Sequence, residues 1–221
     1  MKKLTVFLLF IVLLPTLTSC KKQQEFFLTK YLSNTRTNIY VATCDDLTVT
    51  AHLGCIESPI ESDGEVGDLY TSVQFIIPYT QPEVTYELYL TYNDVTYQEK
   101  FTYDPLENKL VAKIYPEIFT AKSFDAEIKT GGKTYQLNFN SILPDNVKPP
   151  QTVLENLYLS QKTFIDDLTQ NGVFMGEITL KILVTNSTPY YYVAITDKHK
   201  NTKAMLLDAI TGELLAIKDV F

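Results

Sequence analysis

The chain has few of the residues from which catalytic and nucleic-acid-binding sites are built. Its 221 residues contain no tryptophan, two histidines and a single arginine, Arg36. Acidic residues outnumber basic ones by 26 to 19, which gives a formal net charge of −7. Such a surface repels phosphate backbones, and no run of lysines forms a stripe that could follow one. The composition therefore argues against nucleic-acid binding.

The sequence also lacks the common catalytic motifs. His52 and His199 have no partner at the spacing of a metal site or a catalytic triad. No nucleophile elbow, phosphate-binding loop or His-Glu-x-x-His helix is present. Asp166 and Asp167 are adjacent on a predicted helix, so their carboxylates point in different directions and indicate solvated charge. We predict a protein that is not an enzyme and that uses no cofactor or metal.

The longest apolar run is too short to span a membrane. Met1, Lys2 and Lys3 precede an almost wholly apolar stretch over residues 4–14, and a spanning helix needs about 20 such residues. A positive start, a short apolar stretch and small residues after it are typical of an export signal that is removed. We predict that residues 1–19 are a signal peptide.

The end of this segment, Leu17-Thr18-Ser19-Cys20, resembles the lipobox of bacterial lipoproteins. The resemblance implies that Cys20 becomes the mature N-terminus and carries a thioether-linked diacylglycerol with further acylation, such as palmitate. Two or three acyl chains, at about 0.8 kcal/mol per buried methylene, hold a protein firmly on a membrane. The expected location is the cell membrane, with the chain facing the extracytoplasmic side.

Cys44 and Cys55 form the other cysteine pair, and outside the cytoplasm a pair is a candidate disulfide. If Asp45 and Asp46 turn a hairpin, a straight second strand carries Cys55 about eight steps of roughly 3.3 Å away from Cys44. A disulfide needs Cα atoms within about 7 Å. Either the strand bends back and the pair is bridged, or both thiols are free, which the geometry favours.

Residues 36–141 show the alternation of half-buried strands. Two alternating runs, residues 84–92 and 95–103, flank Asn93-Asp94 and predict a tight hairpin. A second hairpin is centred on Gly131-Gly132, with Phe124, Ala126 and Ile128 facing Phe139, Leu137 and Tyr135. Further strand candidates cover residues 38–43, 47–53, 70–77 and 109–115. About eight strands without a long helix predict an Ig-like antiparallel β-sandwich of two facing sheets. Residues 20–35, before it, are a lipid-anchored tether or hold one short helix.

Three prolines in residues 142–150 break the alternation and mark a linker. In residues 151–221 the period becomes helical, with Thr152 and Glu155 as a capping box and Asn171-Gly172 as a stop. Strands are then predicted over residues 178–185, 190–196, 203–207 and 213–218. We expect an α+β domain with one helix across an antiparallel sheet, so that the whole chain is mainly β.

This C-terminal third resembles the PepSY domain of bacterial propeptides and envelope proteins. The resemblance is carried by the helix, by the run Tyr191-Tyr192-Val193-Ala194-Ile195-Thr196-Asp197, and by Asp208-Ala209-Ile210-Thr211-Gly212-Glu213 between two strands. Any strand connection favours such a small, polar, glycine-containing turn. The resemblance implies an α+β fold and a role in holding or restraining an envelope or secreted peptidase.

The aromatic residues supply the remaining candidate site. Tyr190, Tyr192 and Tyr89 form a candidate binding surface, because exposed tyrosines can anchor a protein or a polysaccharide. The alternative is that they pack the two domains together. The sequence thus predicts a lipid-anchored envelope protein with a non-catalytic binding or modulating role, either restraining a peptidase or acting as a structural or ligand-capturing surface lipoprotein.

Overall fold

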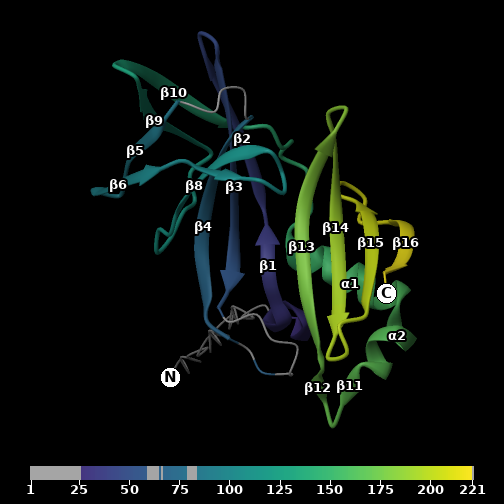
Figure 1. Ribbon diagram of the computed structural model, residues 1–221. Helices are drawn as coiled ribbons and strands as arrows, with labels where there is room; N and C mark the ends of the chain where they lie inside the picture. The colour runs from purple at the N-terminus through teal and green to yellow at the C-terminus, as the bar shows by residue number, and fades with distance from the viewer. Residues whose placement is uncertain (1–25, 59–64, 66, 79–83, 221) are drawn as a thin grey trace, which may run out of the picture.

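The computed structural model of the protein describes residues 26–58, 65, 67–78 and 84–220, and it consists mainly of strands (Figure 1). Fourteen of the strands belong to one mixed sheet, and two short ones form a separate hairpin. The predicted signal peptide and Cys20 lie outside the described residues. Within those residues, no helix has the length and apolar character needed to cross a membrane.

The helical segments lie near the start of the described chain and in its C-terminal third, and the elements between them are strands. The strands are β1 (Leu32–Arg36), β2 (Asn38–Cys44), β3 (Leu47–Glu57), β4 (Leu69–Pro78), β5 (Glu87–Tyr92), β6 (Val95–Lys100), β7 (Thr102–Asp104), β8 (Lys109–Ile114), β9 (Ser123–Thr130), β10 (Lys133–Ser141), β11 (Thr169–Gln170), β12 (Val173–Phe174), β13 (Gly176–Thr185), β14 (Thr188–Asp197), β15 (Thr202–Asp208) and β16 (Leu214–Val220). The helices are the 3-10 helix η1 (Phe27–Tyr31), α1 (Pro150–Ser160) and α2 (Lys162–Asp167).

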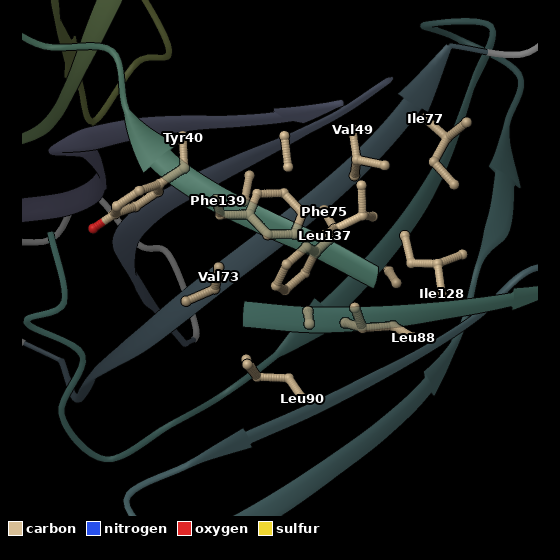
Figure 2. Packing of buried hydrophobic residues seen from close by; sticks show 14 of the residues in the cluster. Tyr40, Val49, Val73, Phe75, Ile77, Leu88, Leu90, Ile128, Leu137 and Phe139 are labelled. Carbon is tan, nitrogen blue, oxygen red and sulfur yellow. The ribbon is translucent and has the colours of Figure 1, made fainter. Parts of the chain in front are cut away.

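The N-terminal half forms two facing layers of antiparallel strands. One layer contains β2, β3, β4 and β8, and the other contains β10, β9, β5 and β6. Aromatic side chains fill the space between them: Phe124 stacks on Phe139 at 4.8 Å between ring centroids, and Phe75 meets Phe139 edge-on at 5.5 Å (Figure 2). The predicted two layers are present, but β10 pairs with β2, so they are parts of one continuous sheet.

Both predicted hairpins of this half pair in the predicted register, but the strand predicted over residues 95–103 is divided into β6 and β7, and β7 pairs with β8. Tyr92 pairs with Val95 around Asn93 and Asp94, whose φ angles of 50° and 62° suit a tight hairpin turn. Around Gly131-Gly132, the three predicted pairs between β9 and β10 are all formed. Local turn chemistry and alternation were sufficient to define both pairings.

The C-terminal third forms an antiparallel sheet of β13, β14, β15 and β16, with α1 and α2 on one face (Figure 1). Leu154 and Leu157 of α1 and Ile165 of α2 are fully buried against Ile178 and Ile182 of β13 in a second hydrophobic core. The predicted combination of helix and antiparallel sheet is therefore present.

The helix itself differs from the prediction in its start, continuity and end. It begins at Pro150, and the predicted capping residue Thr152 is already inside α1. Proline suits the first helical position because that position needs no N–H donor. The stripe is then interrupted at Gln161, where φ is −123°, and α2 ends at Asp167. Asn171-Gly172 turns the β11–β12 hairpin instead of stopping a helix.

The segment predicted as a tether or a short helix contains the short 3-10 helix η1 and most of β1. Leu28 of η1 is fully buried in the second core, and β1 pairs in parallel with β13. On its other side β1 pairs with β3 through Asn34 and Ile56. The parallel partner of β1 lies about 145 residues away and leaves no local pattern, so alternation in the sequence did not reveal β1.

Gly54 allows β1 to cross β3. A Cβ atom at Gly54 would lie 1.8 Å from the carbonyl oxygen of Thr35 and 3.1 Å from the Cα of Arg36. The hydroxyl of Thr35 accepts a hydrogen bond from the Cys55 N–H at 2.7 Å, and the Thr37 N–H donates to the Leu53 carbonyl at 2.8 Å. The backbones are thus held at a separation that no side chain at residue 54 would permit.

We predict that Gly54→Ala lowers the free energy of unfolding by about 2–4 kcal/mol, because the methyl group must displace backbone that is bonded on both sides. Urea denaturation followed by circular dichroism measures this loss. Gly131→Asn is the control: a Cβ there meets nothing within 4 Å, and asparagine tolerates its φ of +48°. Equal stability losses in the two variants would contradict a tight crossing.

Candidate functional site: a cationic hollow

A hollow of about 210 Å³ opens where β1 crosses from β3 to β13. Its lining comes from five strands, β1, β3, β4, β8 and β13, and it is mostly polar. We call it the cationic hollow and define it by Asn34, Arg36, His52, Gln74, Lys113 and Lys181, with Tyr115 also lining it.

Strand register explains why these side chains meet. Lys113 pairs with Gln74 and Gln74 pairs with His52, so the three form a row across β8, β4 and β3. Arg36 pairs with Lys181, which in turn pairs with Tyr192 across β1, β13 and β14. Cross-strand partners share a sheet face, and neighbouring strands lie about 4.8 Å apart. The two rows meet where Arg36 reaches His52.

The contact between Arg36 and His52 joins the rows. Arg36 Nη1 lies 3.4 Å from His52 Nε2, which accepts the hydrogen bond when the imidazole carries its proton on Nδ1. Burial, and then the positive charges of Arg36, Lys109 and Lys181, lower the pKa of His52 to about 4, against a smaller opposing effect of Glu107. His52 is therefore neutral at pH 7.

The cations of the hollow have no anionic partner among the described residues. The ion pairs that the described chain forms involve none of Arg36, Lys113 and Lys181. Lys133, by contrast, has Asp45 and Asp46 at 3.2 and 3.1 Å. Other described lysines without an ion pair, such as Lys198 and Lys200, are exposed, whereas Arg36 and Lys181 are partly buried.

Burial makes this arrangement costly. Desolvation lowers the pKa of Arg36, and the negative charge of Glu107 only partly opposes this effect. Desolvation also lowers the pKa of Lys181, helped by the positive charges of Arg36 and Lys113, while Glu107 again opposes the shift. Glu107 is itself paired with Lys109 at 2.8 Å. A bound anion would relieve this uncompensated positive charge.

The tyrosines predicted as a binding surface do not form one patch. Tyr192 pairs with Lys181 and lies on the sheet face of the hollow. Tyr190, two residues before it in β14, is on the same face. Tyr89 belongs to the other layer, where its hydroxyl donates to Glu87 at 2.8 Å and Lys129 lies 4.0 Å from its ring centroid. The third residue of the tyrosine run, Tyr191, is buried and donates to the Lys148 carbonyl at 2.9 Å.

The cysteine pair is free in the structure. Cys44 ends β2 and pairs with Leu47, whereas Cys55 lies near the far end of the straight strand β3 and pairs with Thr71. The candidate disulfide between Cys44 and Cys55 is therefore absent, for the geometric reason that favoured free thiols. Within the described residues, no three or more His, Cys, Asp or Glu side chains converge as metal ligands would.

A larger hollow of about 450 Å³ lies beside the linker, and its charged lining residues are Lys122, Asp145 and Lys148. Lys122 there pairs with Asp145 at 3.3 Å, and both side chains are almost fully exposed. Prolines 144, 149 and 150 form much of its wall. Lys148 is its one charged lining residue outside that ion pair, so it is a weaker candidate than the cationic hollow with its three cations.

Sequence reasoning missed the cationic hollow. Its one sequence signal is Arg36, the single arginine of an acidic chain. Lys113 and Lys181 sit on the polar sides of strands and have no distinguishing context. Comparison with protein-family models, curated proteins and solved structures finds no match to this chain.

We predict that His52 makes stability fall on mild acidification. A histidine whose folded pKa is depressed contributes stability that is complete above its unfolded pKa of about 6.5 and is lost as the pH falls toward 4. Between pH 7 and pH 5, wild type should lose about 1–2 kcal/mol through this group. His52→Gln should lose correspondingly less, as urea denaturation at both pH values would show.

His199→Gln is the matched control, because His199 is exposed in the turn between β14 and β15. It should keep the wild-type pH dependence. The same pH dependence in His52→Gln and His199→Gln would show that His52 is not the titrating group.

Proposed function

We propose that the protein is a lipid-anchored extracytoplasmic binding protein without catalytic activity, and that it captures its ligand at the cationic hollow. The observation that carries the binding role is the set of three cations, Arg36, Lys113 and Lys181, without a carboxylate partner among the described residues. Arg36 and Lys181 are partly buried, and proteins rarely bury charge without compensation unless a ligand supplies it.

Sequence supports the membrane location. The segment over residues 1–19 has the three parts of an export signal and ends in the lipobox-like Leu17-Thr18-Ser19-Cys20. Acylation of Cys20 would anchor the chain outside the cytoplasm, with the folded part following within a few residues.

We further propose an Ig-like identity for residues 36–141 and a PepSY-like identity for residues 151–221. The first is supported by two facing antiparallel layers with an aromatic core. The second is supported by helices on one face of four antiparallel strands and by the turn after β15. There Asp208 Oδ1 accepts from the N–H groups of Ile210 and Thr211, both at 2.7 Å, and Gly212 has a φ of +79°.

The PepSY-like proposal brings a second candidate role, the restraint of an envelope or secreted peptidase. Its support is the arrangement of helix, sheet and Asp208 turn, and it does not involve the cationic hollow. A structural or ligand-capturing lipoprotein without a peptidase partner is the alternative. Identifying the captured molecule separates these roles.

Replacement of Cys20 tests the anchor. Cells labelled with palmitate should incorporate label into wild type and into Cys44→Ser, and none into Cys20→Ser. The wild-type protein should fractionate with membranes. Mass spectrometry of mature wild type without acyl chains at residue 20, or its recovery from the cytosol, would contradict the anchor.

Photo-crosslinking in intact cells tests the binding role and its place. A photoreactive residue at Tyr115 or Tyr192, beside the hollow, should yield specific adducts, whereas the same residue at Tyr89, on the other layer, should not. Mass spectrometry of the adducts identifies the captured molecule, and a peptidase among them would favour the restraining role. Adducts at Tyr89 equal to or above those at Tyr115 and Tyr192 would contradict binding at the hollow.

A further inference from the structure

The cationic hollow has the chemistry of an oxyanion site. The guanidinium of Arg36 is a planar group with five N–H donors, and only its contact with His52 Nε2 is formed within the described chain. Guanidinium donors match the spacing of carboxylate and phosphate oxygens. The remaining donors of Arg36 are thus suited to such a group.

The lysines extend this site in two directions. Lys181 lies beside Arg36 on the adjacent strand, and Lys113 lies two strands from His52, roughly 10 Å away. Between them Asn34, Gln74 and Ser72 supply uncharged hydrogen-bonding groups. The positive charges therefore surround the hollow instead of forming one point, which favours a ligand with more than one negative charge.

The size of the hollow limits the ligand. About 210 Å³ corresponds to roughly seven water-sized groups, which is below the range for a drug-sized molecule. Inorganic phosphate or a short dicarboxylate fits this volume, as does the acidic end of a larger molecule that continues over Tyr115 or Tyr192.

We propose that the cationic hollow binds the oxyanion group of a small ligand with two negative charges, held by Arg36 and Lys181 and reached by Lys113. This inference rests on the proposed binding role and names its ligand chemistry. The ligand group is a phosphate or a dicarboxylate, and titration with inorganic phosphate and with succinate distinguishes the two.

Calorimetric titration of the lipidated chain, purified from membranes in a non-ionic detergent, tests the proposal at pH 7 and fixed ionic strength. The probes are inorganic phosphate, succinate, acetate and chloride. We expect phosphate, succinate or both to bind once per chain, and acetate to bind at least about tenfold more weakly because it has one charge. Binding of phosphate alone identifies a phosphate site, and binding of succinate identifies a carboxylate site.

Variants locate the binding. Arg36→Gln and Lys181→Gln should each weaken the binding of the di-anion about tenfold or more, because both cations are partly buried. Lys113→Gln, at an exposed position that cannot disturb the core, should weaken it about two- to fivefold. Lys122→Gln makes the same charge change at an exposed residue that does not line the hollow and should bind as wild type.

The proposal is overturned if no di-anion binds to wild type, or if Lys113→Gln and Arg36→Gln both bind with wild-type affinity. Thermal unfolding of each variant shows whether a loss of binding reflects a loss of fold. If Arg36→Gln and Lys181→Gln unfold, the affinity of Lys113→Gln tests whether the di-anion binds at the hollow. Absence of di-anion binding together with adducts at Tyr115 would leave the binding role intact and reject the ligand class. Absence of both would reject the binding role itself.

Discussion

The structure depends on one close approach of two backbones, where β1 passes Gly54 of β3. Because residue 54 has no side chain, the carbonyl of Thr35 occupies the space that a Cβ atom would fill. On one side of this crossing, β1 continues the sheet into β13 and the second core; on the other, β3 belongs to the aromatic core of the N-terminal half. The two hydrophobic cores thus meet at β1, and they also share β2, since Ile39 belongs to the second core and Tyr40 to the first. The same crossing brings Arg36 over His52, so the cationic hollow is a direct product of the joint between the two halves.

The joint is positively charged, although the chain as a whole is acidic. A protein with a net charge of −7 could neutralise every lysine at its surface, and Lys133 shows how readily it does so with two aspartates. At the joint, burial instead lowers the pKa values of Arg36 and Lys181, which disfavours their charged forms, and it keeps His52 neutral. The neutral imidazole is useful there, since it accepts from Arg36 without adding a fourth positive charge. The free energy for holding such a site comes from the two cores, whose aromatic and aliphatic packing is independent of it.

Local patterns in the sequence predicted what local physics controls. Alternation and turn residues gave the hairpins at Asn93-Asp94 and Gly131-Gly132, and the four C-terminal strands were expected close to their observed positions. Three features could not be read this way. The helix start was misplaced because Pro150 can begin a helix without a capping side chain. The strand β1 was missed because its main partner is β13, distant in sequence. The cationic hollow was missed because its residues come from five strands and become neighbours only through that pairing.

The predicted lipid anchor and the cationic hollow are close along the chain, and an acylated Cys20 would restrict where the proposed site can lie. Phe26 lies six residues after Cys20, and a fully extended chain of six Cα-to-Cα steps spans at most about 22 Å. An acylated Cys20 would therefore hold η1 and β1 near the outer surface of the membrane, with the hollow a few residues further along. A ligand with two negative charges would be captured from the layer of solvent next to the lipid headgroups. In that layer salt screens charges over about 8 Å, so only cations gathered in one partly buried hollow retain a strong attraction. Lysines scattered over an acidic surface would not, which is a physical reason for this chain to concentrate its single arginine and two lysines at one joint.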